Sequence, residues 1–317
     1  MSSRLEARDL RLSIPFPGGR ALAVSGLSMS LAAGETLALV GESGCGKSLT
    51  ALALLGLLPE GVRREGGEVL LDGKAVASSD RGRRIGLVFQ DPQAALNPVR
   101  TVGGQVAEVL RMHRALPSCD VGRGVEAALA RVGLPDPARQ AVAYPHELSG
   151  GMRQRAAIAI ALAGGPSVLL ADEPTTALDA TVQAQVLELL RRLSREEGLS
   201  VLLVTHDLGV ASTADRIAVM YAGRVVEEGP ARAVLASPGH PYTRGLMGSR
   251  PADPRAPLSP IPGQVPTPGD WPSGCAFHPR CGLAEERCRR ETQELMAMGA
   301  GRLTACWKSA ALLSSGA

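Results

Sequence analysis

The stretch GESGCGKS, residues 41–48, decides the fold of this chain. It matches the phosphate-binding loop pattern G-x-x-x-x-G-K-[ST] at every fixed position. Residues 36–40 are apolar and predict a short buried strand before the loop. Residues 49–58 are rich in Leu and Ala and predict a helix after it. Because strand, glycine turn and helix are the context that this motif requires, the sequence predicts an α/β fold with a P-loop.

The residue types in this loop suit a bound phosphate chain. Glycines let backbone N–H groups converge on an anion, and the N-terminus of the following helix adds partial positive charge. Lys47 is expected to reach the β- and γ-phosphates, and the Ser48 hydroxyl to bind Mg²⁺. The alternative, a glycine-rich turn that binds nothing, is disfavoured by the flanking strand and helix. The ATP-binding residues predicted here are Gly41, Ser43, Gly44, Cys45, Gly46, Lys47, Ser48 and Leu49.

Composition excludes several other classes of protein. With 317 residues, 45% of them hydrophobic and 21% charged, the chain can bury a large core. A net charge of +3 and eight aromatic residues give neither a basic footprint nor stacking surfaces, so we expect no nucleic-acid partner. The N-terminus lacks the apolar run of a signal peptide. The longest uncharged stretch, residues 156–171, falls short of the ~20 residues of a membrane span, so we expect a cytosolic chain that reaches a membrane only peripherally.

The rest of the chain alternates between strand and helix patterns. Residues 5–40 predict β-structure, and residues 93–165 are mostly helical with a break at Pro135 and Pro137. Apolar runs ending at Asp172-Glu173 and at residue 204 predict two further buried strands.

Acidic residues close the first of those strands. A carboxylate at the end of a buried strand beside a phosphate loop can hold Mg²⁺, which we expect of Asp172. The next carboxylate, Glu173, is placed to polarise an attacking water. The alternative is a carboxylate pair that only caps the following helix.

Three further positions invite a functional interpretation. Ser149 stands with two glycines directly before an alanine-rich helix, where it can cap the helix while the amides behind it bind a second anion. His206 follows the strand 201–204, at a strand end where ligands gather in α/β sheets, although lone histidines are usually structural. Phe16 can stack on an adenine face, or it is simply an aromatic at a strand end.

Together these pieces resemble the ATP-binding subunit of an ABC transporter, almost from end to end. The resemblance implies an ATPase whose residues 1–245 form a nucleotide-binding domain. Such a domain has a RecA-like core, an antiparallel β subdomain and an α-helical subdomain, here at about 93–165. The motifs that carry the resemblance are the loop 41–48, Gln90, LSGGM at 148–152, LLADE at 169–173, ALD at 177–179 and His206.

The resemblance also assigns roles to single residues. Phe16 would stack on adenine, and Glu173 would be the catalytic base. Gln90 would bind Mg²⁺, together with Ser48 and Asp172, and couple it to the helical subdomain. The remaining assignments are His206 as the γ-phosphate switch, Asp179 in the D-loop, and Ser149, Gly150 and Gly151 on nucleotide held by a second ATP-binding subunit. Met152 departs from the family, which usually has glutamine there, but the amides and the serine remain.

A narrower resemblance is to the dipeptide, oligopeptide and nickel importer branch. It rests on FQDPQAALNP at 89–98, LSGGMRQR at 148–155 and HPYTR at 240–244. It implies import of peptides, with nickel or an opine-like metallophore as the alternative cargo. The implied partners are two transmembrane permease subunits, an identical or paralogous second ATPase and, indirectly, an extracytoplasmic substrate-binding protein. The chain would lie at the cytoplasmic face of the cell membrane.

Two other functions fit the sequence less well. An ABC-type ATPase of DNA repair would carry a very long coiled coil between loop and signature, and a ribosome-acting one usually carries two cassettes; neither pattern is present. A metal sensor with an attached ATPase is disfavoured because every ATPase element is intact.

Residues 246–317 are expected to form a proline-rich connector and a cysteine-bearing extension. Cysteines in a cytosolic chain are more often thiols or metal ligands than disulfides. Four thiolates can hold a [4Fe–4S] cluster or a Zn²⁺ ion. The lack of a C-x₂₋₄-C pair and the branch resemblance favour the cluster, while four apolar thiols without metal remain the alternative. The candidate ligands are Cys275, Cys281, Cys288 and Cys306, whereas Cys45 and Cys119 lie outside the group.

Overall fold

The computed structural model forms two compact units, each assembled from separate segments of the chain. The structure describes residues 3–91, 95–114, 117–176, 178–249 and 260–314. The first unit consists of Met1–Leu5, Leu31–Thr36 and Leu71–Val204, and the second of Glu6–Ser30, Leu37–Leu70 and Thr205–Ala317. The domain boundary near residue 245 stays a prediction. Ala177, residues 92–94 of the importer-branch motif and residues 250–259 of the connector lie outside the described residues.

The first unit contains the parallel strands β8, β7 and β6, in that order. Most of their residues are apolar and buried, as expected of parallel strands covered on both faces. The strands of this unit are β5 (Lys74–Ala75), β6 (Ile85–Val88), β7 (Val168–Asp172) and β8 (Ser200–Thr205). Its helices are α3 (Val102–Arg114), α4 (Val121–Arg131), α5 (Pro137–Val142), α6 (Gly150–Ala163) and α7 (Ala180–Glu197).

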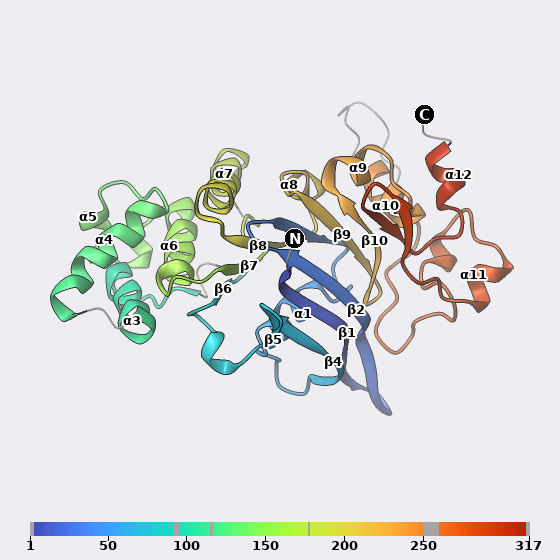
Figure 1. The fold of residues 1–317 in the computed structure, drawn as a ribbon, viewed down its shortest axis with the longest axis horizontal. Coiled ribbons are helices and arrows are strands. Elements are labelled where there is room, and N and C mark those ends of the chain that lie inside the picture. Colours follow the sequence, from blue (N-terminus) through green and yellow to red (C-terminus); the bar gives the residue numbers. More distant parts are fainter. Residues whose placement is uncertain (1–2, 92–94, 115–116, 177, 250–259, 315–317) are drawn as a thin grey trace. The chain divides into compact units, whose positions relative to one another are not determined.

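Helices α3 to α6 gather into one bundle (Figure 1). The predicted break lies between α4 and α5, because Pro137 occupies the first position of α5, where its missing N–H is not needed. Asp136 caps this helix by accepting a hydrogen bond from the Arg139 N–H at 3.3 Å. The helical prediction for this segment is therefore confirmed in its described part.

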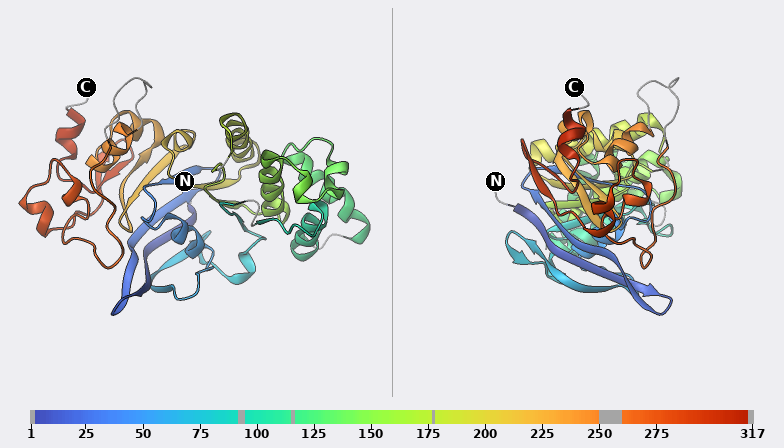
Figure 2. Two further views of the ribbon diagram at one scale, coloured as in Figure 1. Left: turned by 180° about the vertical axis from the view of Figure 1, so that it is seen from behind. Right: turned by 90° about the vertical axis from the view of Figure 1, so that its right-hand side faces the viewer.

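The second unit contains two sheets. One has the order β11-β12-β10-β9-β3, with β3 and β9 parallel and the other pairs antiparallel. The other has the neighbours β2-β1-β4, and Figure 2 shows β1 and β2, in blue, as one long hairpin. The strands are β1 (Ser3–Phe16), β2 (Gly19–Ala32), β3 (Thr36–Val40), β4 (Arg63–Leu71), β9 (Arg216–Tyr221), β10 (Arg224–Pro230), β11 (Met296–Gly299) and β12 (Arg302–Thr304). The helices are α1 (Lys47–Leu54), α8 (Leu208–Ala211), α9 (Ala231–Ala236), α10 (Pro241–Gly248), α11 (Glu286–Arg290) and α12 (Ser309–Ser314).

The helix after the phosphate loop is shorter than the sequence predicts. It ends at Leu54 instead of residue 58, because Gly56 adopts a left-handed φ of 65°. The Leu57 N–H then donates back to the Leu52 carbonyl at 2.9 Å, which closes the helix in the manner of a glycine C-cap.

The C-terminal extension shares the core of the second unit. Strand β12 pairs with β10, where Glu227 lies opposite Thr304. Phe277 is buried against Tyr221 and Tyr242, with ring centroids 5.2 and 5.4 Å apart. The extension is thus built into the unit that carries the phosphate loop.

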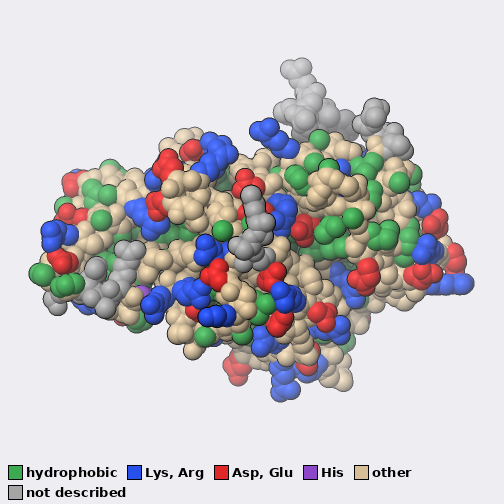
Figure 3. Space-filling view, in the orientation of Figure 1, with side chains coloured by type: hydrophobic (Ala, Val, Ile, Leu, Met, Phe, Trp, Pro, Cys, Tyr) green, Lys and Arg blue, Asp and Glu red, His purple; other side chains and the backbone are tan. Residues whose placement is uncertain are grey.

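The surface agrees with the charge balance of the sequence. On the face shown in Figure 3, positive and negative side chains are interspersed. No helix in the described part of the chain is long and apolar enough to cross a membrane.

Candidate ATP site

Close backbone packing explains the fixed glycines of the phosphate loop. A Cβ on Gly41 would lie 2.2 Å from the Met220 carbonyl oxygen, so no larger residue fits without moving β9. Gly46 has a φ of 105°, and a Cβ there would lie 2.9 Å from the Ala23 carbonyl oxygen. These two glycines let β3 turn sharply into α1, whose N-terminus then lies at the loop.

Lys47 lies folded over the loop that precedes it. Its side chain is buried, and Nζ donates to the carbonyl oxygens of Gly41 at 2.8 Å and Glu42 at 3.0 Å. Cys45 is buried beside it, and this burial raises the pKa of the Cys45 thiol. Ser43, Gly44 and Ser48 are exposed. The loop thus holds a fixed ammonium group beside exposed backbone, which is what a phosphate chain requires.

Two other predicted residues of the second unit lie near strand ends. Phe16 ends β1 half-buried, and a Cβ on Gly269 would lie 2.5 Å from its Cε2 and Cζ atoms. The connector therefore covers part of this ring. His206 is exposed directly after β8. Their roles toward adenine and the γ-phosphate stay predictions.

Glu173 and Gln90 of the first unit are brought together. The Gln90 Nε2 group donates to Glu173 Oε2 at 3.1 Å, and the Thr176 hydroxyl donates to the same oxygen at 2.9 Å. Glu173 adopts a φ of 46°, which is unusual for a residue with a side chain, and its N–H donates to the Val204 carbonyl at 2.8 Å. Such backbone strain concentrates at functional sites. Asp172 precedes it, half-buried at the end of β7.

The signature residues form an exposed helix start. Ser149 is the N-cap of α6, and its Oγ accepts a hydrogen bond from the Met152 N–H at 3.3 Å. Ser149 and Gly150 are exposed, whereas a Cβ on Gly151 would lie 2.5 Å from Val182 Cγ1. Asp179 caps α7 in the same way, accepting from the Val182 N–H at 2.9 Å. The predicted N-cap is confirmed, and both segments have a structural reason for their residue types.

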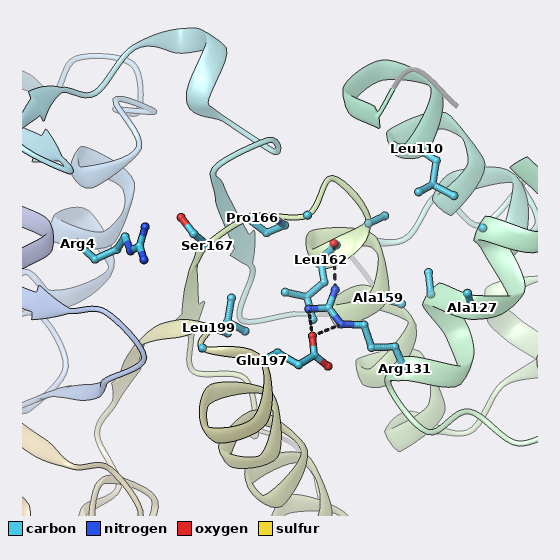
Figure 4. A pocket seen from close by; sticks show the side chains of 15 residues that line it. Arg4, Leu110, Ala127, Arg131, Ala159, Leu162, Pro166, Ser167, Glu197 and Leu199 are labelled. Carbon is cyan, nitrogen blue, oxygen red and sulfur yellow. Dashed lines mark hydrogen bonds and ion pairs between the residues drawn. The ribbon is translucent and has the colours of Figure 1, made fainter. Parts of the chain in front are cut away.

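A cavity of about 550 Å³ in the first unit is separate from these motifs (Figure 4). Arg131 lies at its wall and donates to Glu197 Oε2 at 2.8 Å through Nε and to the Leu162 carbonyl at 3.4 Å. This contact ties α4, α6 and the end of α7 together. The residues that line the cavity include none of the predicted ATP-site residues.

The four cysteines of the extension line one small cavity together with His240, Phe277 and Trp307. Burial raises the pKa of Cys275 and Cys281, and that of Cys306 to about 11. The Leu283 N–H donates to Cys281 Sγ at 3.4 Å. Among the described residues, however, no three His, Cys, Asp or Glu side chains lie close enough together to hold a metal ion. The predicted metal site is therefore not supported by this arrangement.

Two residues that hold the phosphate loop in place were not predicted from the sequence. Arg280 and Tyr242 both contact Glu42, the second residue of the loop. Tyr242 lies in the HPYTR motif at 240–244 and Arg280 in the segment FHPRC at 277–281, but nothing in the sequence pairs either residue with the loop.

Comparison with known families agrees with this geometry. The ABC transporter family matches residues 24–176, and the C-terminal region of oligopeptide/dipeptide transporters matches residues 226–288. A protein of Brucella ovis is 47% identical over 306 residues, which cover 90% of each chain. One of Brucella melitensis biotype 1 is 47% identical over 312 residues, covering 95% of this chain and 94% of the relative. Both are named as peptide import ATP-binding proteins.

Solved structures show the same cassette. The dimeric bacterial ABC transporter cassette MJ0796 is 30% identical, with a TM-score of 0.63, and covers 72% of this chain and 99% of that one. A post-hydrolysis state of MJ0796, bound to ADP and Pi, matches equally well. The cbiO1 protein of Clostridium perfringens is 28% identical, with a TM-score of 0.64.

Fold, loop and signature together define an ABC-type ATPase, as the sequence predicts. The two family matches and the relatives from Brucella then identify a narrower group within this class of ATPase. The chain belongs to the ATP-binding subunits of ABC transporters, in the oligopeptide/dipeptide branch.

Proposed function

We propose that this chain binds and hydrolyses ATP to energise the import of di- and oligopeptides across the cell membrane. The observation that carries the proposal is one chain with both an intact phosphate loop and the oligopeptide/dipeptide C-terminal region at 226–288. Relatives with 47% identity are named for peptide import, so peptides are favoured over nickel or an opine-like metallophore.

The chain's own residues supply the parts of a hydrolytic site. Lys47 and the amides of residues 43–49 would hold the phosphates, and Ser48, Gln90 and Asp172 would hold Mg²⁺. Mg²⁺ would neutralise charge on the β- and γ-phosphates. Glu173 would orient the attacking water and accept its proton, because Gln90 and Thr176 fix one carboxylate oxygen.

A second ATP-binding subunit would complete each site. Ser149 and Gly150 are exposed at the N-terminus of α6, where amides and helix dipole favour an anion from outside the chain. The similar cassette MJ0796 is dimeric. We infer a head-to-tail pair in which this segment faces the partner's nucleotide.

Permease subunits would contact the first unit at the cytoplasmic face of the membrane. Contiguous exposed apolar patches mark protein interfaces, whereas single exposed apolar side chains are common on any surface. Several of the large exposed ones among the described residues fall between 89 and 144, namely Phe89, Val99, Met112, Val142 and Tyr144. An extracytoplasmic binding protein would then act through the permeases.

Co-purification of the assembled complex tests this function. A tagged full-length chain, extracted from its native membranes in mild detergent, is expected to bring down two permease subunits and an ATP-binding subunit. Ribosomal or DNA-repair proteins as the stoichiometric partners would instead favour the other ABC-type functions.

We further propose that the extension's four cysteines hold a [4Fe–4S] cluster that cross-links it. The supporting observations are that the four thiols line one cavity and that the Leu283 N–H donates to Cys281 Sγ at 3.4 Å. Because no three of the described metal-binding side chains lie close enough together to hold an ion, the thiols would have to move closer to one another to bind the cluster. Since burial raises the pKa of Cys275, Cys281 and Cys306, bound iron would have to displace their protons. The cluster would serve stability, because a small tail has little core of its own.

Anaerobic purification followed by metal analysis and visible absorbance tests the cluster. Four irons per chain with a thiolate-to-iron band are expected, both lost in Cys281→Ser, whereas Cys119→Ser serves as the control. One zinc per chain would replace the cluster by a zinc site. No metal, with Cys281→Ser leaving the melting temperature unchanged, would show that the thiols only pack together.

A further inference from the structure

An arginine of the C-terminal extension forms an ion pair with a glutamate of the phosphate loop. Arg280 donates to both carboxylate oxygens of Glu42, from Nη1 to Oε2 at 2.8 Å and from Nη2 to Oε1 at 3.0 Å. The Arg280 side chain is only 5% exposed, and its Nε donates to the Pro262 carbonyl at 2.8 Å. All three nitrogens of the guanidinium group are therefore held by hydrogen bonds. The two parallel bonds to Glu42 set the orientation of the Glu42 carboxylate as well as its position.

A second hydrogen bond holds the backbone of Glu42. The Glu42 N–H donates to the Tyr242 hydroxyl at 2.8 Å. Tyr242 is fully buried in an aromatic cluster with Tyr221 and Phe277, at centroid distances of 4.6 and 5.4 Å. Phe277 and Arg280 belong to the same short turn of the extension, so this turn supports the loop both through the cluster and through the ion pair.

Glu42 also takes part in holding the Lys47 side chain. Glu42 follows Gly41, and its carbonyl accepts a hydrogen bond from the Lys47 ammonium at 3.0 Å. Gly41 and Gly44 lie on either side of Glu42, and glycine restricts the backbone less than other residues do. An anchor that removes this freedom before the nucleotide arrives lowers the entropy cost of binding and keeps the phosphate-binding groups aligned.

We propose that Arg280 is a positioning residue for ATP binding, which acts through Glu42 to hold the phosphate loop in its binding conformation. The proposal rests on the assignment of residues 41–48 to the phosphates. It gives the C-terminal extension a task in the ATPase site that is distinct from metal binding, since the described hydrogen bonds of the Arg280 side chain go to Pro262, Glu42 and Tyr221 and to no cysteine sulfur.

Equilibrium binding of Mg-ATP to the full-length chain tests the proposal. Arg280→Ala is expected to raise the Kd for ATP about tenfold, because it leaves the Glu42 carboxylate without its buried partner. Arg280→Lys should bind ATP more tightly than Arg280→Ala, because lysine keeps the positive charge but cannot form two parallel hydrogen bonds to the carboxylate. Glu42→Gln should weaken binding in the same direction. The double variant Arg280→Ala/Glu42→Gln should bind ATP no more weakly than the single variant with the lower affinity, because both substitutions remove the same contact.

A matched control separates positioning from general stability. Arg302 forms a comparable buried pair with Glu227 at 3.0 Å, which joins β12 to β10 and does not include the loop. Arg302→Ala should lower the melting temperature while leaving the Kd for ATP within about twofold. This comparison is made at a temperature where every variant is folded.

Each outcome decides between specific alternatives. If Lys47→Ala binds ATP like the wild type, the phosphate-loop assignment itself is wrong. If Lys47→Ala binds weakly but Arg280→Ala binds normally, the loop is assigned correctly and the Arg280 proposal is overturned. If Arg280→Ala fails to fold, Arg280→Lys and Glu42→Gln carry the test, and wild-type affinity in both would overturn it. Additive losses in the double variant would likewise rule out action through Glu42.

Discussion

Glu173→Gln is expected to lower the rate of ATP hydrolysis by roughly 10²- to 10⁴-fold while ATP stays bound, because a general base acts only in the transition state. Glutamine keeps the shape and one oxygen that can accept from Gln90 and Thr176, so the local fold should persist. The variant should accumulate as a closed, ATP-loaded pair of subunits. Lys47→Ala should behave differently, since its loss weakens nucleotide binding itself.

The measurement is single-turnover hydrolysis in the assembled complex, with bound nucleotide quantified separately. Glu188→Gln is the control, because that side chain is exposed on α7 and pairs only with Arg191 in the described contacts. Near-normal hydrolysis in Glu173→Gln would remove this residue from the role of base.

Ser149→Arg is expected to reduce hydrolysis at least about 100-fold without unfolding the chain. A long cation at this exposed helix start would block an approaching nucleotide. Loss of the N-cap alone should cost only about 1 kcal/mol of stability. The subunit that carries the change should still bind ATP at its own phosphate loop.

Ser149→Asp distinguishes the two roles of this residue. Aspartate caps a helix as well as serine does, but its charge would repel a phosphate, so this variant should be stable and inactive. Hydrolysis and ATP binding are measured for both variants in a complex with one altered and one wild-type subunit. Loss of ATP binding at the altered subunit's own loop would argue against the head-to-tail arrangement.

The sequence predicted those features that short segments determine. The phosphate loop, the buried strands β7 and β8, and the cap at Ser149 each depend on residues adjacent in the chain, so local patterns sufficed. The end of α1 was misjudged, since the Leu and Ala content continues while Gly56 turns the backbone out of the helix.

Long-range contacts could not be predicted in this way. Arg280 and Glu42 are 238 positions apart, and neither residue signals its partner. The contact between Gly269 and Phe16 is of the same kind. The four cysteines show the opposite error. Their spacing and residue type predicted a metal site, but among the described residues no three potential ligands lie close enough together to hold an ion.

The proposed function requires that ATP hydrolysis by this chain drives peptide uptake. The most direct measurement is the accumulation of a labelled oligopeptide in proteoliposomes that contain the complete transporter, with the binding protein and ATP supplied on opposite sides. We predict ATP-dependent uptake with the wild-type chain, and uptake at background level with Glu173→Gln. Peptide accumulation that is unchanged by Glu173→Gln, or hydrolysis that is never accompanied by peptide uptake, would show that ATP hydrolysis by this chain does not drive peptide import.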